Sequence, residues 1–316
     1  MSGGSPALRV SVVMPAYRSE DRVAASLTAL RAQTYRDFEI VLVNSYPDGT
    51  AAIVANGFPE VVFEQSEVRL LPHAARNRGV AKARGELLVF TDPDCRPDSR
   101  WLERLVAACD SGHPVVGGAI ELEGGGRFAR GVHLAKFYWL LSGLPAGVRR
   151  IVCSGNACYS RSAWETVGPF DAEFSIGDAL LSWRASTAGL EPWFEPNAVV
   201  RGRQDRGVRQ SWREFRARGR ELAEARACLE RWPRRRAAAY VLLAPLVLAT
   251  VLGRAALATF AARRRTTFVG ALPALFFCRL AWTVGEAGYL LDFVRGHASP
   301  RSLRRSPELV RRALRT

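Results

Sequence analysis

The sequence predicts an α/β fold built on a mostly parallel central sheet with helices on both faces. Short apolar runs rich in β-branched residues, such as 9–14 ("RVSVVM") and 38–43 ("FEIVLV"), alternate with segments of helical periodicity. Strands joined by helices run parallel, and ligands bind beyond their carboxyl ends. One of these runs ends in two carboxylates, within the heptapeptide "VFTDPDC" from Val89 to Cys95.

The segment between the first two strands is predicted to be a helix. Its apolar residues recur at Val23, Leu27 and Leu30, and acidic residues stand in its first turn. A third strand, a second helix and a fourth strand follow before the paired carboxylates. The predicted strands are 9–14, 38–43, 61–64 and 86–92, and the predicted helices are 19–35 and 74–84.

Composition restricts the class of protein. The chain has 316 residues, of which 48% are hydrophobic, and this suffices for at least one full core. A formal net charge of +15 favours anionic partners, namely phosphorylated ligands, anionic lipid or nucleic acid. The six cysteines show no CxxC pair, which is typical of reduced thiols in a cytosolic domain. No signal-peptide pattern precedes the first strand, so we expect the N-terminal part in the cytoplasm.

Asp92 and Asp94 lie one residue apart at the carboxyl end of a predicted strand. Two carboxylates at this spacing can approach one divalent cation, and Mg²⁺ or Mn²⁺ takes oxygen ligands while retaining substrate phosphates. The pair therefore indicates a cation that carries a diphosphate. An ordinary polar turn is the alternative, because Pro93 is a turn former and Asp is common in turns.

Four stretches follow one another in an informative order. They are "SVVMPAYRSEDRVAASLTALRAQTY", "VNSYPDGT", "ARNRGVAKARGELLVFTDPDC" and "GPFDAEFSIGDALLSWRASTAGL". Together they resemble the inverting glycosyltransferases of family 2, of the membrane-associated bacterial type, which have the GT-A fold. The resemblance covers about residues 8–205. It implies a GT-A domain at 1–205, with a nucleotide-sugar half at about 8–125 and an acceptor half at 126–205.

The resemblance also implies roles for individual residues. Asp178 in "IGDALLSWR" would remove the acceptor proton, although a carboxylate before a helical stretch is also a routine cap. Asp94 would bind the metal directly, and Asp92 would lie near the ribose or the metal. Asn156 and Arg201 are candidates for the acceptor side. The residues expected at the nucleotide are Pro15, Ala16 and Tyr17 of "MPAY", Asn44, Arg76, Asn77 and Asp92.

Three positions depart from the family pattern. Val43 and Asn44 stand where the family usually has two adjacent aspartates, so the base preference is open. Gly177 replaces the glutamate that commonly precedes the base. Arg201 stands near a position at which many members have a histidine. Arginine binds phosphate through two hydrogen bonds but does not ligate a metal.

The composition changes after residue 205. Residues 206–236 are predicted to form a basic amphipathic juxtamembrane helix, and residues 237–295 a hydrophobic helical hairpin. A basic tail at 296–316 completes the chain. Basic residues beside apolar stretches favour anionic lipid over nucleic acid as the partner.

Two uncharged stretches lie at 237–253 and 266–278, and the first is marginal in length for crossing a bilayer. We expect attachment to the cell membrane with the catalytic domain facing the cytoplasm. A re-entrant hairpin is slightly preferred to two crossings, because it keeps every basic cluster on the cytoplasmic side.

These features predict an inverting glycosyltransferase of cell-envelope or exopolysaccharide synthesis that uses Mn²⁺ or Mg²⁺. Its expected partners are a nucleotide-diphosphate sugar, with a UDP-sugar as the default, membrane lipid, and a glycan or lipid-linked acceptor that offers a hydroxyl or a phosphate. Nucleic acid is not expected. A related nucleotidyltransferase is one alternative, disfavoured because no Gly-rich, Lys-bearing loop lies near the start. The departures at Asn44, Gly177 and Arg201 suggest a second alternative, a degenerate membrane-bound carbohydrate or lipid scaffold.

Overall fold

The computed structural model describes residues 8–298, and the chain divides into two compact units. The first, called the N-terminal unit below, comprises Met1–Glu123 and Pro145–Arg203. The second, called the helical unit, comprises Gly124–Leu144 and Gln204–Thr316. Most of the predicted basic tail at 296–316 lies outside the described residues.

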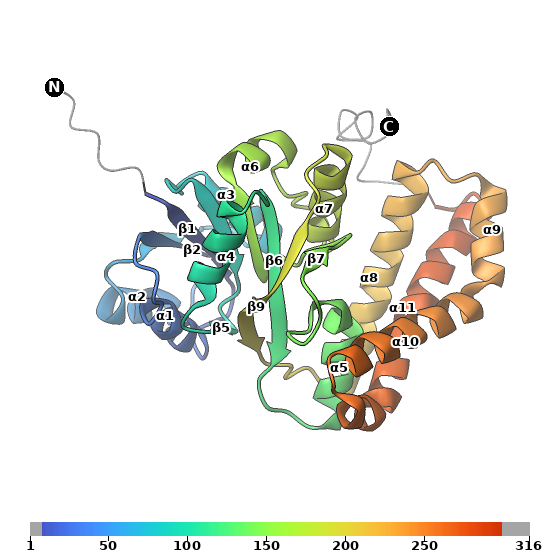
Figure 1. Cartoon of the computed structure of the whole chain (residues 1–316). Coiled ribbons are helices and arrows are strands. Elements are labelled where there is room, and N and C mark those ends of the chain that lie inside the picture. The colour runs from blue at the N-terminus through green and yellow to red at the C-terminus, as the bar shows by residue number, and fades with distance from the viewer. Residues whose placement is uncertain (1–7, 299–316) are drawn as a thin grey trace. The chain divides into compact units, whose positions relative to one another are not determined.

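The N-terminal unit is built on one mixed sheet (Figure 1). Its strands follow the order β3-β2-β1-β4-β8-β6-β9-β5, and β7 pairs with β9. The first four strands of the chain run parallel to one another, whereas β8 is antiparallel to β4 and β6. The predicted α/β fold class is thereby confirmed. The strands are β1 (Val10–Ala16), β2 (Phe38–Asn44), β3 (Val62–Gln65), β4 (Leu87–Thr91), β5 (Cys95–Pro97), β6 (Val115–Leu122), β7 (Gly147–Val148), β8 (Asn156–Ser160) and β9 (Trp193–Gly202).

Helices pack on the sheet of the N-terminal unit. Helix α3 contacts β1 and β2, and α4 contacts β6 and β9. Strands β1 and β4 are buried at every position, which explains why they read as continuous apolar runs in the sequence. The helices of this unit are α1 (Val23–Arg31), α2 (Thr50–Gly57), α3 (Pro72–Val80), α4 (Trp101–Asp110), α6 (Arg161–Val167) and α7 (Gly177–Thr187).

The structure corrects two helix boundaries. Helix α1 begins at Val23, so the acidic residues before it are not in its first turn. One of them, Glu20, instead accepts a hydrogen bond from the Gly49 backbone N–H at 2.8 Å, which joins the loops after β1 and β2. Helix α3 begins at Pro72 rather than near residue 74, because proline suits the first turn of a helix.

The helical unit contains α5 (Arg127–Phe137), the 3₁₀ turn η1 (Tyr138–Leu140), α8 (Val208–Leu229), α9 (Arg234–Leu242), α10 (Ala244–Ala261) and α11 (Arg265–Val294). Helices α10 and α11 are long and apolar enough to cross a bilayer, with window mean hydropathies of 1.6 and 1.5. By length and composition alone, this is weak support for membrane association. Helix α11 continues through Pro273, so the predicted apolar segment at 266–278 is only its first half.

Glycines bring α11 into backbone contact with its neighbours. A Cβ atom at Gly285 would lie 2.0 Å from the Arg216 carbonyl oxygen of α8, and one at Gly219 would lie 2.1 Å from the Trp282 carbonyl oxygen. At Gly131 of α5, a Cβ atom would lie 2.7 Å from the backbone of α11. Only glycine permits such close approaches. Through these contacts α5 and α8 both pack directly on α11.

Candidate active site

The turn after β4 places two carboxylates at the carboxyl edge of the sheet. Ligand atoms of Asp92, Asp94 and Cys95 all lie within 4.8 Å of one another. Burial raises the pKa of the Cys95 thiol well above its ordinary value, and a thiol is a soft donor that hard cations such as Mg²⁺ do not favour. The two carboxylates remain as hard oxygen donors, and this donor set fits Mg²⁺ or Mn²⁺. Gly155 faces the Asp92 carboxylate, since a Cβ there would lie 3.0 Å from its Oδ2.

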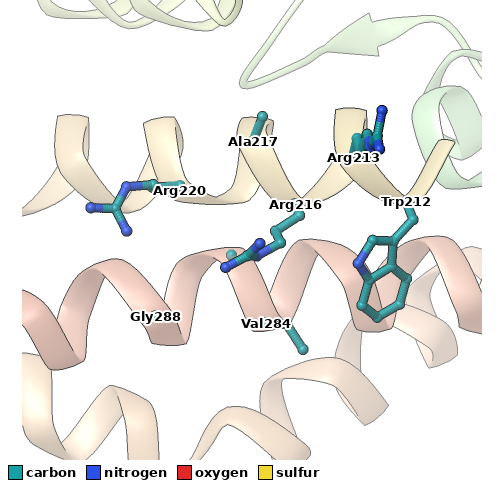
Figure 2. Close-up of a pocket in the computed structure, with 8 residues that line it drawn as sticks. Trp212, Arg213, Arg216, Ala217, Arg220, Val284 and Gly288 are labelled. Carbon is teal, nitrogen blue, oxygen red and sulfur yellow. The ribbon is translucent and has the colours of Figure 1, made fainter. Parts of the chain in front are cut away.

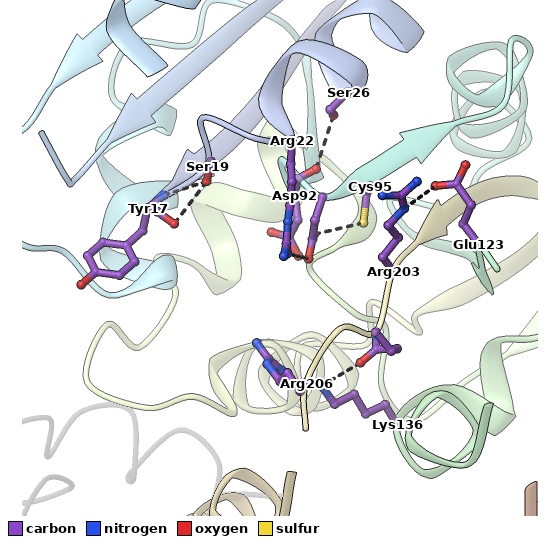
Figure 3. A network of polar contacts seen from close by, with 12 residues as sticks. Tyr17, Ser19, Arg22, Ser26, Asp92, Cys95, Glu123, Lys136, Arg203 and Arg206 are labelled. Atoms are coloured by element: carbon purple, nitrogen blue, oxygen red, sulfur yellow. Dashed lines mark hydrogen bonds and ion pairs between the residues drawn. The ribbon is translucent and has the colours of Figure 1, made fainter. Parts of the chain in front are cut away.

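Arg76 of α3 stabilises the first of these carboxylates. Its guanidinium is only 3% exposed and forms an ion pair with Asp92. Burial raises the pKa of Asp92, the Arg76 charge opposes that rise, and the carboxylates of Asp94 and Asp178 add to it. Crowding of this kind is relieved by a bound cation. Arg22, just before α1, approaches Asp94 with 3.9 Å between Nη1 and Oδ2 and lies beside Asp92 in Figure 3.

Asp178 lies in the first turn of α7. Its Oδ1 accepts a hydrogen bond from the Ala179 N–H at 2.9 Å, a contact between neighbouring residues, whereas the N-cap residue is Ile176 and α7 has no side-chain cap. The side chain is only partly buried. Burial is the main cause of the raised pKa of both Asp92 and the Cys153 thiol, and the negative charge of Asp178 adds to each rise, which places Asp178 close to the β4 turn.

His73 occupies the space beside Gly177, the residue before Asp178. A Cβ atom at position 177 would lie 2.6 Å from His73 Cδ2, closer than an ordinary contact. The imidazole is buried, stacks on Phe170 with ring centroids 4.8 Å apart, and has Nδ1 at 3.4 Å from Arg76 Nη1. Packing against His73 therefore accounts for the glycine at this position.

This contact makes a testable prediction for Gly177→Ala. We expect the substitution to lower the free energy of unfolding by about 1–3 kcal/mol, the usual cost of overpacking. Urea unfolding followed by tryptophan fluorescence measures this loss. Gly57→Ala is the matched control, because a Cβ atom there meets nothing within 4 Å, so stability should be unchanged or slightly raised. Equal stabilities for the two variants would show that His73 does not constrain position 177.

Aromatic rings and arginines gather where β1 and β2 end. Tyr17 follows Pro15 and Ala16 of β1, and its ring lies edge-on to Tyr46 at 5.2 Å between centroids. The guanidinium of Arg69 is 4.8 Å from the centre of the Tyr17 ring, and that of Arg18 is 4.6 Å from Tyr46. This arrangement offers an aromatic surface for a base and exposed cations for an anion.

Asn44, the last residue of β2, organises the loop beneath this surface. Its Nδ2 donates to the Tyr46 carbonyl oxygen at 2.6 Å, Gln65 Oε1 at 3.0 Å and Asp48 Oδ1 at 3.2 Å. Its own Oδ1 is buried and accepts no hydrogen bond within the described chain. Asp48 also accepts from the Ser19 backbone N–H at 2.9 Å, which ties the loop after β1 to the loop after β2.

Residues 11–168 match the family model described as glycosyl transferase family 2. The chain belongs to this family. The resemblance to family 2 is thereby confirmed, and the carboxylates of the β4 turn lie inside the matched region. The fourth sequence stretch, which contains Asp178, begins at Gly168, where the match ends.

Relatives of this family 2 protein cover part of the chain. It is 29% identical over 204 residues to glycosyltransferase AglE of Haloferax volcanii, spanning 60% of this chain and 65% of AglE. It is also 29% identical over 213 residues to the pre-mycofactocin glycosyltransferase of Mycobacterium tuberculosis, spanning 60% of this chain and 42% of that protein. The match thus spans less than two thirds of the length of either relative.

The family 2 protein resembles a solved mannosyltransferase over most of its length. The mannosyltransferase PcManGT from Pyrobaculum calidifontis, in complex with GDP-Man and Mn²⁺, has a TM-score of 0.58 at 22% sequence identity. The likeness covers 92% of this chain and 86% of PcManGT. At this level of identity it supports the fold.

Two of the predicted site residues of this family 2 protein make contacts within the fold. Asn77 donates from Nδ2 to the Phe170 carbonyl oxygen at 2.9 Å and accepts from the Phe170 N–H at 3.0 Å. Its amide therefore holds the segment before α7. Arg201 forms an ion pair with Asp98 where β9 meets β5, so its guanidinium is engaged within the fold.

Asn156 is a core residue with 0% exposure. Trp101 Nε1 donates to its Oδ1, and its Nδ2 donates to the carbonyl oxygens of Ala119 and Ala198, all at 2.8 Å. The acceptor-side role expected from the sequence does not fit this position, because neither end of the amide is exposed to a substrate. Its hydrogen bonds instead join β8 to β6 and β9.

Proposed function

We propose that this family 2 protein is an inverting glycosyltransferase that uses a nucleotide-diphosphate sugar. The observation that carries the proposal is the convergence of Asp92, Asp94 and Asp178 with the buried Arg76 at the carboxyl edge of the sheet. The chain brings an acid pair suited to a diphosphate-bound cation together with a separate carboxylate on another element. Those are the two functions that sugar transfer with inversion requires.

Donor binding is assigned to the ends of β1 and β2. Tyr17 and Tyr46 present ring surfaces to the base, and Asn44 holds the loop that carries Tyr46. Arg69, exposed beside Tyr17, is a candidate for contact with the diphosphate. We retain uridine as the default base.

Asp94 and Asp92 would hold Mn²⁺ or Mg²⁺. When bound, the cation would supply charge neutralisation for the departing nucleoside diphosphate. Arg76 orients the Asp92 carboxylate through their ion pair.

Asp178 is the proposed general base. It would accept the proton of the acceptor hydroxyl as that oxygen attacks the anomeric carbon on the face opposite the diphosphate. The bond between the anomeric carbon and the diphosphate oxygen breaks in the same step. We propose a glycan or lipid-linked acceptor that offers a hydroxyl or a phosphate.

Hydrolysis of candidate nucleotide sugars tests this function. We expect release of nucleoside diphosphate from at least one UDP- or GDP-linked sugar in the presence of Mn²⁺, and its loss on chelation. Tight binding of a sugar or lipid without turnover of any donor would favour the alternative of a scaffold.

Membrane association is proposed to be monotopic, with the catalytic unit in the cytoplasm. Helix α11 is in backbone contact with α8, whose exposed face carries Arg209, Arg213, Arg216 and Arg220. If α11 crossed the bilayer with α8 attached, each of these arginines at the bilayer centre would cost about 2.5–3.5 kcal/mol. A hairpin that lies in the interface avoids this cost.

A cysteine in the turn between α10 and α11 distinguishes the two topologies. Arg263 is exposed and lies in this turn. We expect Arg263→Cys to react with a membrane-impermeant thiol reagent only after cells are permeabilised. The unsubstituted chain, with its six free cysteines, sets the background. Labelling in intact cells would mean two crossings and would contradict the monotopic arrangement.

A further inference from the structure

A groove runs between α8 and α11 in the helical unit. It has a volume of about 380 Å³, and its lining includes Trp212, Arg213, Arg216, Arg220, Val284 and Gly288. Figure 2 shows Arg216 and Trp212 extending from α8 across α11. A second hollow of about 370 Å³ adjoins it, since Trp212 and Arg213 line both.

The groove carries positive charge that the described chain does not neutralise. Arg213 and Arg216 are exposed and form no ion pair with any residue in 8–298. Arg220, one turn beyond Arg216, forms an ion pair with Asp292 at 3.1 Å. The unpaired arginines of the groove are therefore Arg213 and Arg216. Two unpaired arginines three residues apart on α8 favour a ligand with phosphate oxygens, which arginine binds through parallel hydrogen bonds.

The groove also has an apolar side. Val284 lines it and is 39% exposed, and Phe277, two turns earlier on the same face of α11, lines the adjoining hollow. An apolar stripe therefore passes directly beside the unpaired arginines. A soluble phosphate compound would leave this stripe exposed to water, whereas an amphiphile would cover it.

Gly288 keeps the groove open. A Cβ atom at this position would meet nothing within 4 Å, in contrast to Gly285 one turn earlier, where the helices touch. The empty space next to Gly288 is therefore part of the groove and not part of the contact between α8 and α11.

We propose that this groove binds the headgroup phosphate of an anionic phospholipid. Arg213 and Arg216 hold the phosphate, and an acyl chain lies along α11 past Val284. The proposal rests on the membrane association proposed above, and it assigns that association to one specific site rather than to diffuse positive charge.

Vesicle binding by the full chain tests the site. We expect tighter binding to phosphatidylcholine vesicles that contain phosphatidylglycerol than to phosphatidylcholine alone. Arg213→Gln with Arg216→Gln should weaken binding to the anionic vesicles about 30-fold, since each basic side chain at an anionic surface contributes about a fivefold factor. Arg127→Gln with Arg130→Gln is the control, because these arginines are also exposed and unpaired within the described chain but lie on α5.

A neutral substitution separates the site from general electrostatic attraction. Gly288→Leu fills the groove without changing charge, and we expect it to abolish the preference for phosphatidylglycerol. Gly253→Leu is its control, because a Cβ at that position of α10 also meets nothing within 4 Å. Circular dichroism and thermal unfolding verify that each variant folds. Wild-type behaviour of folded Gly288→Leu, or equal losses for the two arginine pairs, would overturn the proposal.

Soluble ligands identify the occupant. Monomeric dihexanoyl phosphatidylglycerol should quench or shift the fluorescence of Trp212, judged against a Trp212→Phe variant, and inorganic phosphate should not compete with it. Competition by inorganic phosphate or by a short RNA at equal affinity would overturn the assignment to lipid. Nucleotide-sugar hydrolysis by Gly288→Leu should match wild type, so failure of this proposal is distinguishable from failure of the proposed catalytic function. If the unsubstituted chain binds neither kind of vesicle, both the membrane association and the lipid site are rejected.

Discussion

Asp178→Asn is expected to retain donor binding while the turnover rate falls by about 100-fold or more, in line with removal of a general base. The asparagine carbonyl oxygen can still accept the hydrogen bond that Asp178 Oδ1 accepts from Ala179, so the start of α7 is preserved. Release of nucleoside diphosphate measures turnover, and calorimetry measures donor affinity.

Asp171→Asn is a matched control for this substitution. Asp171 lies in the segment before α7 and its Oδ1 accepts from the Glu173 N–H at 3.2 Å, but it has no proposed catalytic role. Its loss should leave turnover near the wild-type rate. If donor affinity fell as much as turnover in Asp178→Asn, the residue would be structural and another group would have to remove the proton.

Asp94→Asn is expected to reduce metal-dependent nucleotide affinity by more than about 100-fold. Loss of an outer-shell partner typically costs 10- to 100-fold in metal affinity, and Asp94 is proposed as a direct ligand. Without metal, the variant should bind nucleotide no more weakly than wild type, because the substitution removes a negative charge near the diphosphate. Calorimetric titration with Mn²⁺ and with a chelator measures both affinities.

Asp37→Asn provides the surface control for Asp94→Asn, since Asp37 is an exposed carboxylate of the same unit just before β2. Its nucleotide affinity should be unchanged in both conditions. Equal Mn²⁺-dependent affinity in wild type and Asp94→Asn would remove this carboxylate from the metal site.

The buried strands and the carboxylate turn were predictable from the sequence because both depend on local patterns. Strands β1 and β4 are apolar throughout, since each is covered on both faces. The two acids after β4 stand at the carboxyl end of a parallel strand, a position that topology alone makes a binding edge. A family pattern then added Asp178, which no local rule separates from an ordinary helix cap.

Other features of the site depend on contacts between distant segments. The sequence shows Gly177 only as a departure from the family pattern, and the structure supplies its cause, because His73 Cδ2 lies 2.6 Å from the Cβ position. Asn156 lies in a motif region, but the carbonyl groups that satisfy its amide come from β6 and β9. The only indication of a role for Tyr46 in the sequence is that it is an aromatic residue in a turn. Its ring contacts Tyr17 only because β1 and β2 are adjacent in the sheet.

The helical unit illustrates the same limit. The sequence marks α8 as basic and amphipathic, which is a helix-local property. That α8 and α11 meet through Gly219 and Gly285, and that Gly288 is left open, are properties of the packed pair. Consequently the sequence indicates an affinity for anionic lipid, whereas the groove appears only in the structure.

Thermal unfolding with nucleoside diphosphates, in the presence and absence of Mn²⁺, tests the central claim most directly. A ligand at a hundredfold excess over its dissociation constant stabilises the folded state by about 2.7 kcal/mol. For a unit of this size we expect a rise in Tm of about 5–10 °C, with one diphosphate and Mn²⁺ together and not with either alone. An equal rise in the presence of a chelator would contradict a metal-bound diphosphate at Asp92 and Asp94.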